Sequence, residues 1–245
     1  MLDFGFYNMD CMTGMKQFPD KFFDLAIVDP PYGINADLFN NGAGASKDKG
    51  AVYSTAVKAR KGRLNQGAGK LKNRVLNQSD CSWDREPPSK EYFAELQRVS
   101  KHQIIWGGNY FDLPPTRGVI VWDKMQPWEN FSQIEYAWTS FDTPAKIFRM
   151  ANTLPGKIHP TQKPIALYEW IINKYAKEGD TILDTHAGSA SSLIACHRTG
   201  HKYVGFEIDE YYYKMAKKRL DAEMSQMTIF DIYNGDTLYG QESRT

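Results

Sequence analysis

The chain has few cysteines and no long apolar run. Its three cysteines, Cys11, Cys81 and Cys196, form no Cys-x-x-Cys pair, and His159 and His186 have no evident third ligand. This set predicts no metal site and no disulfide framework, and it favours the reducing cytoplasm. No apolar stretch approaches the roughly 20 residues needed to cross a bilayer, and the N-terminus lacks a basic segment followed by an apolar one. We therefore expect a cytoplasmic protein without membrane association.

The net charge is only +1, so the overall charge identifies no partner. The distribution is uneven, because Asp48 is the only acid between residues 41 and 78 while basic residues recur there. A Gly-rich cationic segment at 35–80 is either a solvated, flexible surface loop or a phosphate-binding loop that orders on nucleic acid. Its place directly after a catalytic-looking strand end favours nucleic acid. The candidate contacts are Lys47, Lys58, Arg60, Lys61, Arg63, Lys70, Lys72 and Arg74.

A rigid acidic turn, Asp29-Pro30-Pro31-Tyr32, follows a predicted buried strand that ends at Val28. In open α/β sheets, ligands bind at this carboxyl edge. The carboxylate and the Pro30 carbonyl can accept both N–H bonds of a base amine, and Tyr32 can stack on a base drawn out of a duplex. We expect all four residues of the turn to be catalytic. A common turn with a packing tyrosine is the alternative when each residue is considered alone.

A second pattern of small residues begins at Asp184, after a predicted strand, and continues through Gly188 into a predicted helix. The following strand ends at Glu207, which can accept both hydroxyls of a ribose. The turn has one glycine rather than the three of the dinucleotide fingerprint, and Asp184 would favour a positively charged ligand. A ligand with a ribose, a carboxylate and a positive centre is S-adenosylmethionine. An ordinary βαβ turn is the alternative.

Strands and helices are predicted to alternate along most of the chain. We expect a short strand before residue 10 and a turn or helix near 10–18. Further strands are expected near 24–28, 103–106, 118–122, 134–138, 146–148, 181–183 and 202–206, with helices near 90–99, 165–175, 191–198 and 209–220. This alternation is typical of a Rossmann-like α/β fold with a doubly wound, mostly parallel sheet. We expect residues 1–245 to form one domain, with the basic segment as an insertion.

Together, these motifs resemble the S-adenosylmethionine-dependent DNA amino-methyltransferases of the permuted β class. The catalytic turn precedes the cofactor loop at 184–191, which is the order that defines this class. The family's N-terminal element matches Met9-Asp10-Cys11, and its Lys-Pro segment matches Lys163-Pro164. The resemblance implies a seven-stranded sheet with one reversed strand and a target-recognition segment, for which 126–156 is the further candidate.

The resemblance also implies the cofactor-binding residues. They are Asp10, Cys11, Asp29, His159, Thr161, Lys163, Asp184, His186, Ala187, Gly188, Ser189, Ser191 and Glu207. Three positions depart from the family pattern: Thr185-His186 replace Pro-Phe, Ala190 replaces the second glycine, and Met9 replaces a glycine. These departures bear on cofactor affinity more than on the reaction.

The expected activity is methyl transfer from S-adenosylmethionine to the N6 amine of adenine in double-stranded DNA, after base flipping. Asp-Pro-Pro-Tyr favours adenine within the family, and cytosine N4 is the alternative. A DNA-binding relative without catalysis is a second alternative, and methylation of RNA or of a protein amide ranks lower. The resemblance allows a homodimer and a cognate restriction enzyme as partners, and it suggests a bacterial, phage or mobile-element origin.

Overall fold

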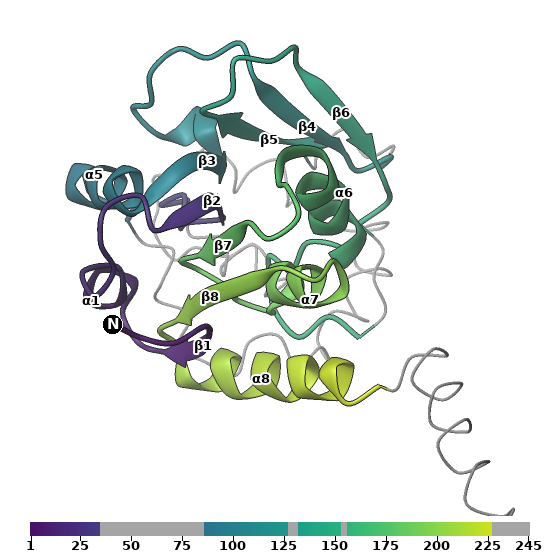
Figure 1. The fold of residues 1–245 in the computed structure, drawn as a ribbon. Coiled ribbons are helices and arrows are strands. Elements are labelled where there is room, and N and C mark those ends of the chain that lie inside the picture. Colours follow the sequence, from purple (N-terminus) through teal and green to yellow (C-terminus); the bar gives the residue numbers. More distant parts are fainter. Residues whose placement is uncertain (35–85, 127–131, 153–155, 227–245) are drawn as a thin grey trace, which may run out of the picture.

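The computed structural model describes residues 1–34, 86–126, 132–152 and 156–226, which form one mixed sheet covered by helices (Figure 1). The sheet has eight strands in the order β1-β8-β7-β2-β3-β5-β4-β6. In chain order, the strands are β1 (Gly5–Asn8), β2 (Phe23–Val28), β3 (Ser100–Trp106), β4 (Val119–Asp123), β5 (Ile134–Thr139), β6 (Lys146–Arg149), β7 (Thr181–Asp184) and β8 (Lys202–Glu207). The expected α/β class is confirmed.

The sheet has one strand more than the seven that the family resemblance implied. The short strand β6 lies at the outer side of β4, where Ile120 pairs with Lys146. Phe148 of β6 packs against Trp170 of α6 (Ile165–Tyr175), with ring centroids 5.5 Å apart. This contact holds β6 against β4. Without β6, the backbone groups on that side of β4 would lack strand partners.

β5 is the reversed strand of the sheet. It pairs antiparallel with β3 and β4, whereas all other neighbouring strands pair in parallel. One reversed strand was implied by the resemblance, and this is confirmed. Because β4 and β5 run in opposite directions, the end of β4 and the start of β5 lie at the same edge of the sheet as the end of β2.

The side chains of the central strands alternate between the two faces, as strand geometry requires. On β2, Leu25 and Ile27 pack in the same core as α6 and α7 (Ser191–Arg198). Ala26 and Val28 pack on the other face with α5 (Lys90–Val99) and α1 (Cys11–Met15). The last helix, α8 (Glu210–Met224), packs against α7 and β1. Both faces of the sheet are therefore buried, which is the doubly wound arrangement.

Two helices differ in length from the prediction. α1 is shorter than 10–18, because the backbone N–H groups of Gln17 and Phe18 bond to carbonyls three residues back rather than four. α8 extends beyond 209–220, and Asp209 caps its first turn by accepting two backbone N–H bonds. Neither difference moves a predicted site residue away from the carboxyl edge of the sheet.

Several predictions fall on residues whose structure is not described. The basic segment at 35–80, with all eight candidate nucleic-acid contacts, lies outside the described residues. So do 127–131 and 153–155 within the candidate target-recognition segment. Among the helices of the described ranges, none is both long and apolar enough to span a membrane.

Candidate active site

A cavity opens at the carboxyl edge of the sheet, beside the ends of β2 and β8. Its volume is about 260 Å³, which is room for far more than a few water molecules. The predicted residues that line it are Asp10, Cys11, Asp29, Pro31, His159, Thr161, Lys163, His186, Ala187, Gly188, Ser189, Ser191 and Glu207. The structure thus brings the predicted catalytic turn and the predicted cofactor loop to one cavity, although they are far apart in the chain.

The cavity lining does not include three of the predicted residues, Pro30, Tyr32 and Asp184. Conversely, five residues that line the cavity were not among the predicted site residues: Met9, Gln162, Tyr168, Thr185 and Ile208. Gln162 and Ile208 are chain neighbours of predicted residues, so adjacency alone could have identified them. Tyr168 lies on α6, and its place in the lining depends on how that helix packs on the sheet.

Asp29 directly follows β2 and has both carboxylate oxygens hydrogen-bonded. Oδ1 accepts the hydroxyl of Tyr32 at 2.6 Å, and Oδ2 accepts the ammonium group of Lys163. Lys163 lies just before α6, and only 2% of its side chain is exposed. The Asp29 carboxylate is therefore oriented from two sides, and Lys163 contacts Asp29 as well as lining the cavity.

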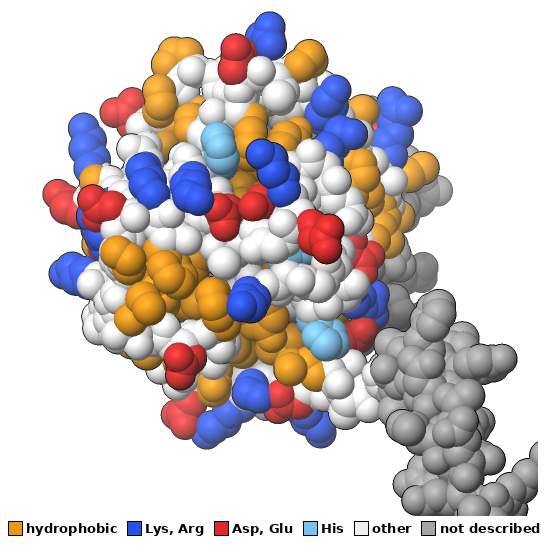
Figure 2. Space-filling view, viewed as in Figure 1, with side chains coloured by type: hydrophobic (Ala, Val, Ile, Leu, Met, Phe, Trp, Pro, Cys, Tyr) orange, Lys and Arg blue, Asp and Glu red, His pale blue; other side chains and the backbone are white. Residues whose placement is uncertain are grey.

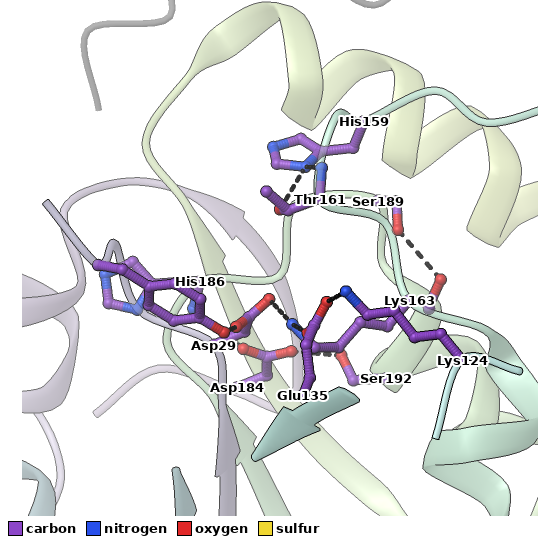
Figure 3. A network of polar contacts seen from close by, with 12 residues as sticks. Asp29, Lys124, Glu135, His159, Thr161, Lys163, Asp184, His186, Ser189 and Ser192 are labelled. Atoms are coloured by element: carbon purple, nitrogen blue, oxygen red, sulfur yellow. Dashed lines mark hydrogen bonds and ion pairs between the residues drawn. The ribbon is translucent and has the colours of Figure 1, made fainter. Parts of the chain in front are cut away.

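The ion pair extends into a chain of alternating charges (Figure 3). Lys163 Nζ lies 3.0 Å from Glu135 Oε2 on β5, and Glu135 Oε1 lies 2.6 Å from Lys124 Nζ, just after β4. The same Lys163 ammonium lies 5.2 Å from the ring centre of the fully buried Trp106. Sequence reasoning missed Glu135 and Lys124. Only the reversed direction of β5 brings them together at this edge.

Burial and ion pairing act in opposite directions on these groups. Burial raises the pKa of Asp29 above its ordinary value, against the opposing effect of Lys163. Burial alone would lower the pKa of Lys163, but its two carboxylate partners outweigh burial and raise it. Burial would raise the pKa of Glu135, but the two lysines outweigh it and hold that pKa below the ordinary value. Lys163 and Glu135 therefore carry their charges at neutral pH.

The ring of Tyr32 contacts the turn that follows β3. Gly107 has a φ of +70°, and a Cβ there would lie 2.2 Å from a Tyr32 ring atom. Tyr110, in the short 3-10 helix η3 (Gly108–Tyr110), stacks on Tyr32 with ring centroids 4.9 Å apart. Tyr110 is 47% exposed. A half-exposed aromatic side chain thus covers one face of the ring that is predicted to hold the target base.

Asp184 is buried beneath the cofactor loop. Its Oδ1 accepts the backbone N–H of His186 at 3.0 Å, and its Oδ2 accepts the hydroxyl of Ser192 (Figure 3). Burial raises the pKa of Asp184 to about 6. The carboxylate at the end of β7 therefore fixes both the start of the loop and the first turn of α7.

Neighbouring side chains hold the shape of the cofactor loop. Ala190 adopts the left-handed conformation, with φ 57° and ψ 25°, where the resemblance places a glycine. That conformation costs an L-residue roughly 1–2 kcal/mol, and Ala190 is fully buried in the cluster that contains Leu193. From α8, Arg219 donates to the Ser189 carbonyl at 2.7 Å and to the Ser191 hydroxyl at 3.0 Å. The loop thus keeps a glycine-type turn without the second glycine.

Glu207 ends β8 and lines the same cavity as Asp29. Its Oε2 accepts the N–H of Gly188 and its Oε1 accepts the N–H of Asp209, each at 2.9 Å. Burial raises the pKa of Glu207 to about 7. Each carboxylate oxygen has a second lone pair, so the group can also accept hydroxyl donors from a ligand.

Two further predicted residues line the cavity through local contacts. His159 packs edge-on against Tyr212, with ring centroids 4.3 Å apart, and its Nδ1 lies 3.1 Å from Thr161 Oγ1. Burial lowers the pKa of His159 to about 3, so the ring is neutral. Asp10 accepts the backbone N–H of Thr13 at 2.9 Å and thereby caps α1. Its cavity position therefore follows from its role as a helix cap.

Thr185 and His186 form a polar wall where the resemblance places Pro-Phe. The Thr185 hydroxyl lies 2.7 Å from the Tyr92 hydroxyl and 2.9 Å from Nδ1 of His186. His186 Nε2 lies 4.0 Å from the sulfur of Cys11. Burial lowers the pKa of His186 to about 4. The replacement therefore still presents a neutral, flat ring to the cavity.

The groups around the cavity fit a cationic ligand with a ribose. Asp10, Asp29 and Glu207 supply carboxylates, and the one lining ammonium group, on Lys163, is paired with carboxylates. Hydroxyl groups on Thr161 and Ser189 can donate to a ligand carboxylate. The residues therefore fit S-adenosylmethionine. Within the described part of the chain, no group of three or more His, Cys, Asp or Glu residues could hold a metal ion.

The viewed face of the molecule carries charges of both signs. Figure 2 shows Lys and Arg side chains interspersed with Asp and Glu, next to a hydrophobic area. The described residues on this face thus form no continuous basic surface of the kind that binds DNA phosphates. The sequence candidates for phosphate contact remain those at 47–74, outside the described ranges.

Comparison with known sequences identifies relatives that span most of the chain. Residues 105–218 match the N6/N4 methylase family, described as DNA methylase. DNA adenine methyltransferase YhdJ of Escherichia coli K12 is 44% identical over 244 residues, which cover 86% of this chain and 81% of the relative. Type II methyltransferase M2.DpnII of Streptococcus pneumoniae is 26% identical, covering 88% of this chain and 89% of the relative.

Solved structures with the same fold are also methyltransferases. The cytosine-N4-specific PvuII DNA methyltransferase aligns with a TM-score of 0.54 at 14% identity, covering 96% of this chain and 92% of that one. The complex of M1.HpyAVI with S-adenosylmethionine aligns with a TM-score of 0.51 at 18% identity, covering 87% and 98%. At these identities the likeness shows the fold alone. With the sequence relatives, the chain belongs to the N6/N4 DNA methylase family and is an S-adenosylmethionine-dependent DNA methyltransferase.

Proposed function

We propose that this methyltransferase modifies the N6 amine of adenine in double-stranded DNA. The observation that carries the proposal is the position of Asp29, whose carboxylate lines the cofactor cavity and is oriented by Tyr32 and Lys163. The Asp-Pro-Pro-Tyr sequence at 29–32 and the 44% identity to an adenine methyltransferase favour adenine.

The residues around the cavity would hold different parts of the cofactor. Glu207 would accept the ribose hydroxyls, Asp10 would contact the adenine end, and Thr161 and Ser189 would donate to the carboxylate end. When bound, S-adenosylmethionine supplies a methyl group on a positively charged sulfur. Asp29 lies in the same lining as these groups, so an amine held by Asp29 faces the cofactor site.

Asp29 and Pro30 hold the target amine. The exocyclic amine of adenine is a poor nucleophile, because its lone pair is delocalised into the ring. Two acceptors, the Asp29 carboxylate and the Pro30 carbonyl, favour a more pyramidal nitrogen and stabilise the developing positive charge. Burial raises the pKa of Asp29, which suits this carboxylate to take up the proton that the amine releases.

Tyr32 holds the ring of the base. Its hydroxyl bonds to Asp29 at 2.6 Å, so one residue links the stacking surface to the amine acceptor. Stacking on an aromatic ring offsets part of the few kcal/mol needed to remove a base from the duplex. The basic segment at 35–80 and the segment 126–156 are the proposed DNA contacts, the first to phosphates and the second to base edges.

The test is to incubate the protein with labelled S-adenosylmethionine and mixed duplex DNA, and then to digest the DNA to nucleosides. We expect label in N6-methyldeoxyadenosine. Label only in N4-methyldeoxycytidine would refute the adenine assignment. Asp29→Ala should abolish transfer while calorimetry still detects cofactor binding, and an Asp29→Ala protein with wild-type activity would refute the role of the carboxylate.

A further inference from the structure

The charge cluster beside the cavity consists of Asp29, Lys163, Glu135 and Lys124. We propose that Glu135, supported by Lys124, positions the Asp29 carboxylate through Lys163. This inference rests on the proposed role of Asp29 as amine acceptor. It adds two residues on the β4–β5 pair to the catalytic machinery, neither of which lines the cofactor cavity.

A second contact is needed to hold the Lys163 ammonium group in one position. A lysine ammonium is a point charge on a flexible four-carbon side chain, with three donors that rotate freely. Here one contact is to Asp29 and another, at 3.0 Å, is to Glu135. The two carboxylates come from different parts of the sheet, one just after β2 and one on β5, and contact the same Nζ. The ammonium group is thereby fixed in direction as well as distance, and so is the Asp29 oxygen that accepts from it.

Lys124 completes the cluster on the other side of Glu135. Its Nζ lies 2.6 Å from Glu135 Oε1, and its side chain is 11% exposed. Its backbone N–H donates to the carbonyl of Gln133 at 2.9 Å, so β4–β5 pairing places both residues. Two carboxylates and two ammonium groups then alternate. Removal of one partner from such a buried pair leaves an uncompensated charge, which is strongly destabilising.

The cluster also sets how strongly Asp29 can bind the amine. If Lys163 interacted with Asp29 alone, its whole charge would weaken that carboxylate as an acceptor. Glu135 shares the ammonium group, so Asp29 remains oriented while keeping more of its negative charge for the substrate. Since a misplacement of about 1 Å can cost 10²-fold in rate, fixing this one oxygen has a large effect on catalysis.

Other charged and titratable groups face Lys163 from the surrounding elements. The ring centroids of Tyr32 and Trp106 lie 6.0 Å and 5.2 Å from its Nζ. Asp184 at the end of β7 and the neutral His159 interact with it at longer range. Asp29 and Glu135 are its two direct carboxylate partners. Loss of the Glu135 charge should therefore lower the pKa of Lys163, and the alkaline limb of the activity profile should move to lower pH.

The decisive variant is Glu135→Gln, assayed as the full chain on adenine-containing duplex DNA. We expect kcat to fall by about tenfold to a hundredfold and the KM for S-adenosylmethionine to change by less than about twofold. The matched control is Glu223→Gln. Its carboxylate also lies 2.6 Å from a cation, Arg198, and is 17% exposed against 23% for Glu135. The control should keep wild-type kcat and pH profile.

Two further variants test whether the effect passes from Lys124 through Glu135 and Lys163 to Asp29. Lys124→Met keeps both contacts of Lys163, so we expect a smaller loss of kcat than in Glu135→Gln. If Glu135 acts through Lys163, the double variant Lys163→Met/Glu135→Gln should be no slower than Lys163→Met alone. If Glu135→Gln does not fold, the kcat of Lys124→Met tests the proposal instead.

The outcomes separate this inference from the proposed function. A wild-type protein that transfers no methyl group to duplex DNA refutes the proposed function. An active wild type with an equally active Glu135→Gln variant, or with losses in kcat that add in the double variant, overturns the positioning role alone.

Discussion

Tyr110 stacks on Tyr32, with ring centroids 4.9 Å apart and planes inclined by 14°. Tyr32 belongs to the proposed catalytic turn at 29–32, whereas Tyr110 lies beyond β3 and is half-exposed. A base that used this face of Tyr32 would have to displace Tyr110. The aromatic pair therefore occupies, in the free protein, a position that the substrate is expected to take.

Tyr110→Ala should strengthen DNA binding. Aromatic pairs contribute about 0.5–1.5 kcal/mol beyond area burial, so removing the competitor should tighten binding by about twofold to thirteenfold. Titration of duplex DNA with 2-aminopurine at the target position would measure both affinity and base extrusion. Weaker binding would show instead that Tyr110 contacts the DNA. Tyr110 is exposed enough for the variant to fold, and a thermal unfolding scan provides the control.

The roles of the Tyr32 hydroxyl and of the Tyr32 ring can be tested separately. Tyr32→Phe removes the hydrogen bond to Asp29 and keeps the stacking surface. Hydrogen bonds to charged groups contribute about 1.5–3 kcal/mol, so kcat should fall by about tenfold or more while DNA affinity stays unchanged. Tyr32→Ala should lower both kcat and DNA affinity. Equal DNA affinity in the alanine variant would argue against stacking on this ring.

Cofactor binding should weaken as the pH falls through about 7. Burial raises the pKa of Glu207 to about 7, so the carboxylate becomes protonated over a range where an ordinary glutamate stays charged. Ribose hydroxyls donate best to the charged form. Below the folded-state pKa, the Kd for S-adenosylmethionine should rise by up to about tenfold per pH unit. Calorimetric titration between pH 6 and pH 8 measures this change.

Glu207→Gln is the control for that titration. The amide cannot titrate, so binding to this variant should be weaker overall and nearly constant across the same range. A wild-type Kd that does not change with pH would mean that Glu207 does not contact the cofactor, or that binding does not depend on its charge.

Arg219→Met should loosen the cofactor loop. Arg219 donates to the Ser189 carbonyl and the Ser191 hydroxyl, and it is the α8 side chain that supports the turn containing the left-handed Ala190. We expect the Kd for S-adenosylmethionine to rise by about tenfold, since loss of one or two hydrogen bonds to a charged group costs on the order of 1.5–3 kcal/mol. Lys218→Met, an exposed neighbour on the same helix, is the matched control. Equal Kd values for the two variants would contradict the supporting role.

The sequence by itself determined the fold class and the order of the motifs, and its resemblance to the methyltransferase family indicated most of the residues around the cavity. Strand periodicity places Asp29, Asp184 and Glu207 at strand ends, and parallel pairing brings such ends to one edge. Some local contacts could also be predicted from the sequence: the position of Asp209 just before a helix identifies it as an N-cap residue. These features depend on residues close together in the chain, where spacing specifies geometry.

Only the tertiary structure decided which groups contact Asp29. Lys163 lies 134 positions from Asp29, and Glu135 reaches the same ammonium because β5 runs against its neighbours. It also decided that Asp184 supports the loop from beneath and that Tyr110 covers Tyr32. The physical reason is that an ion pair or a stacked ring depends on distances of a few ångströms across the fold. Those distances follow from strand order and helix packing, which the local sequence pattern does not specify.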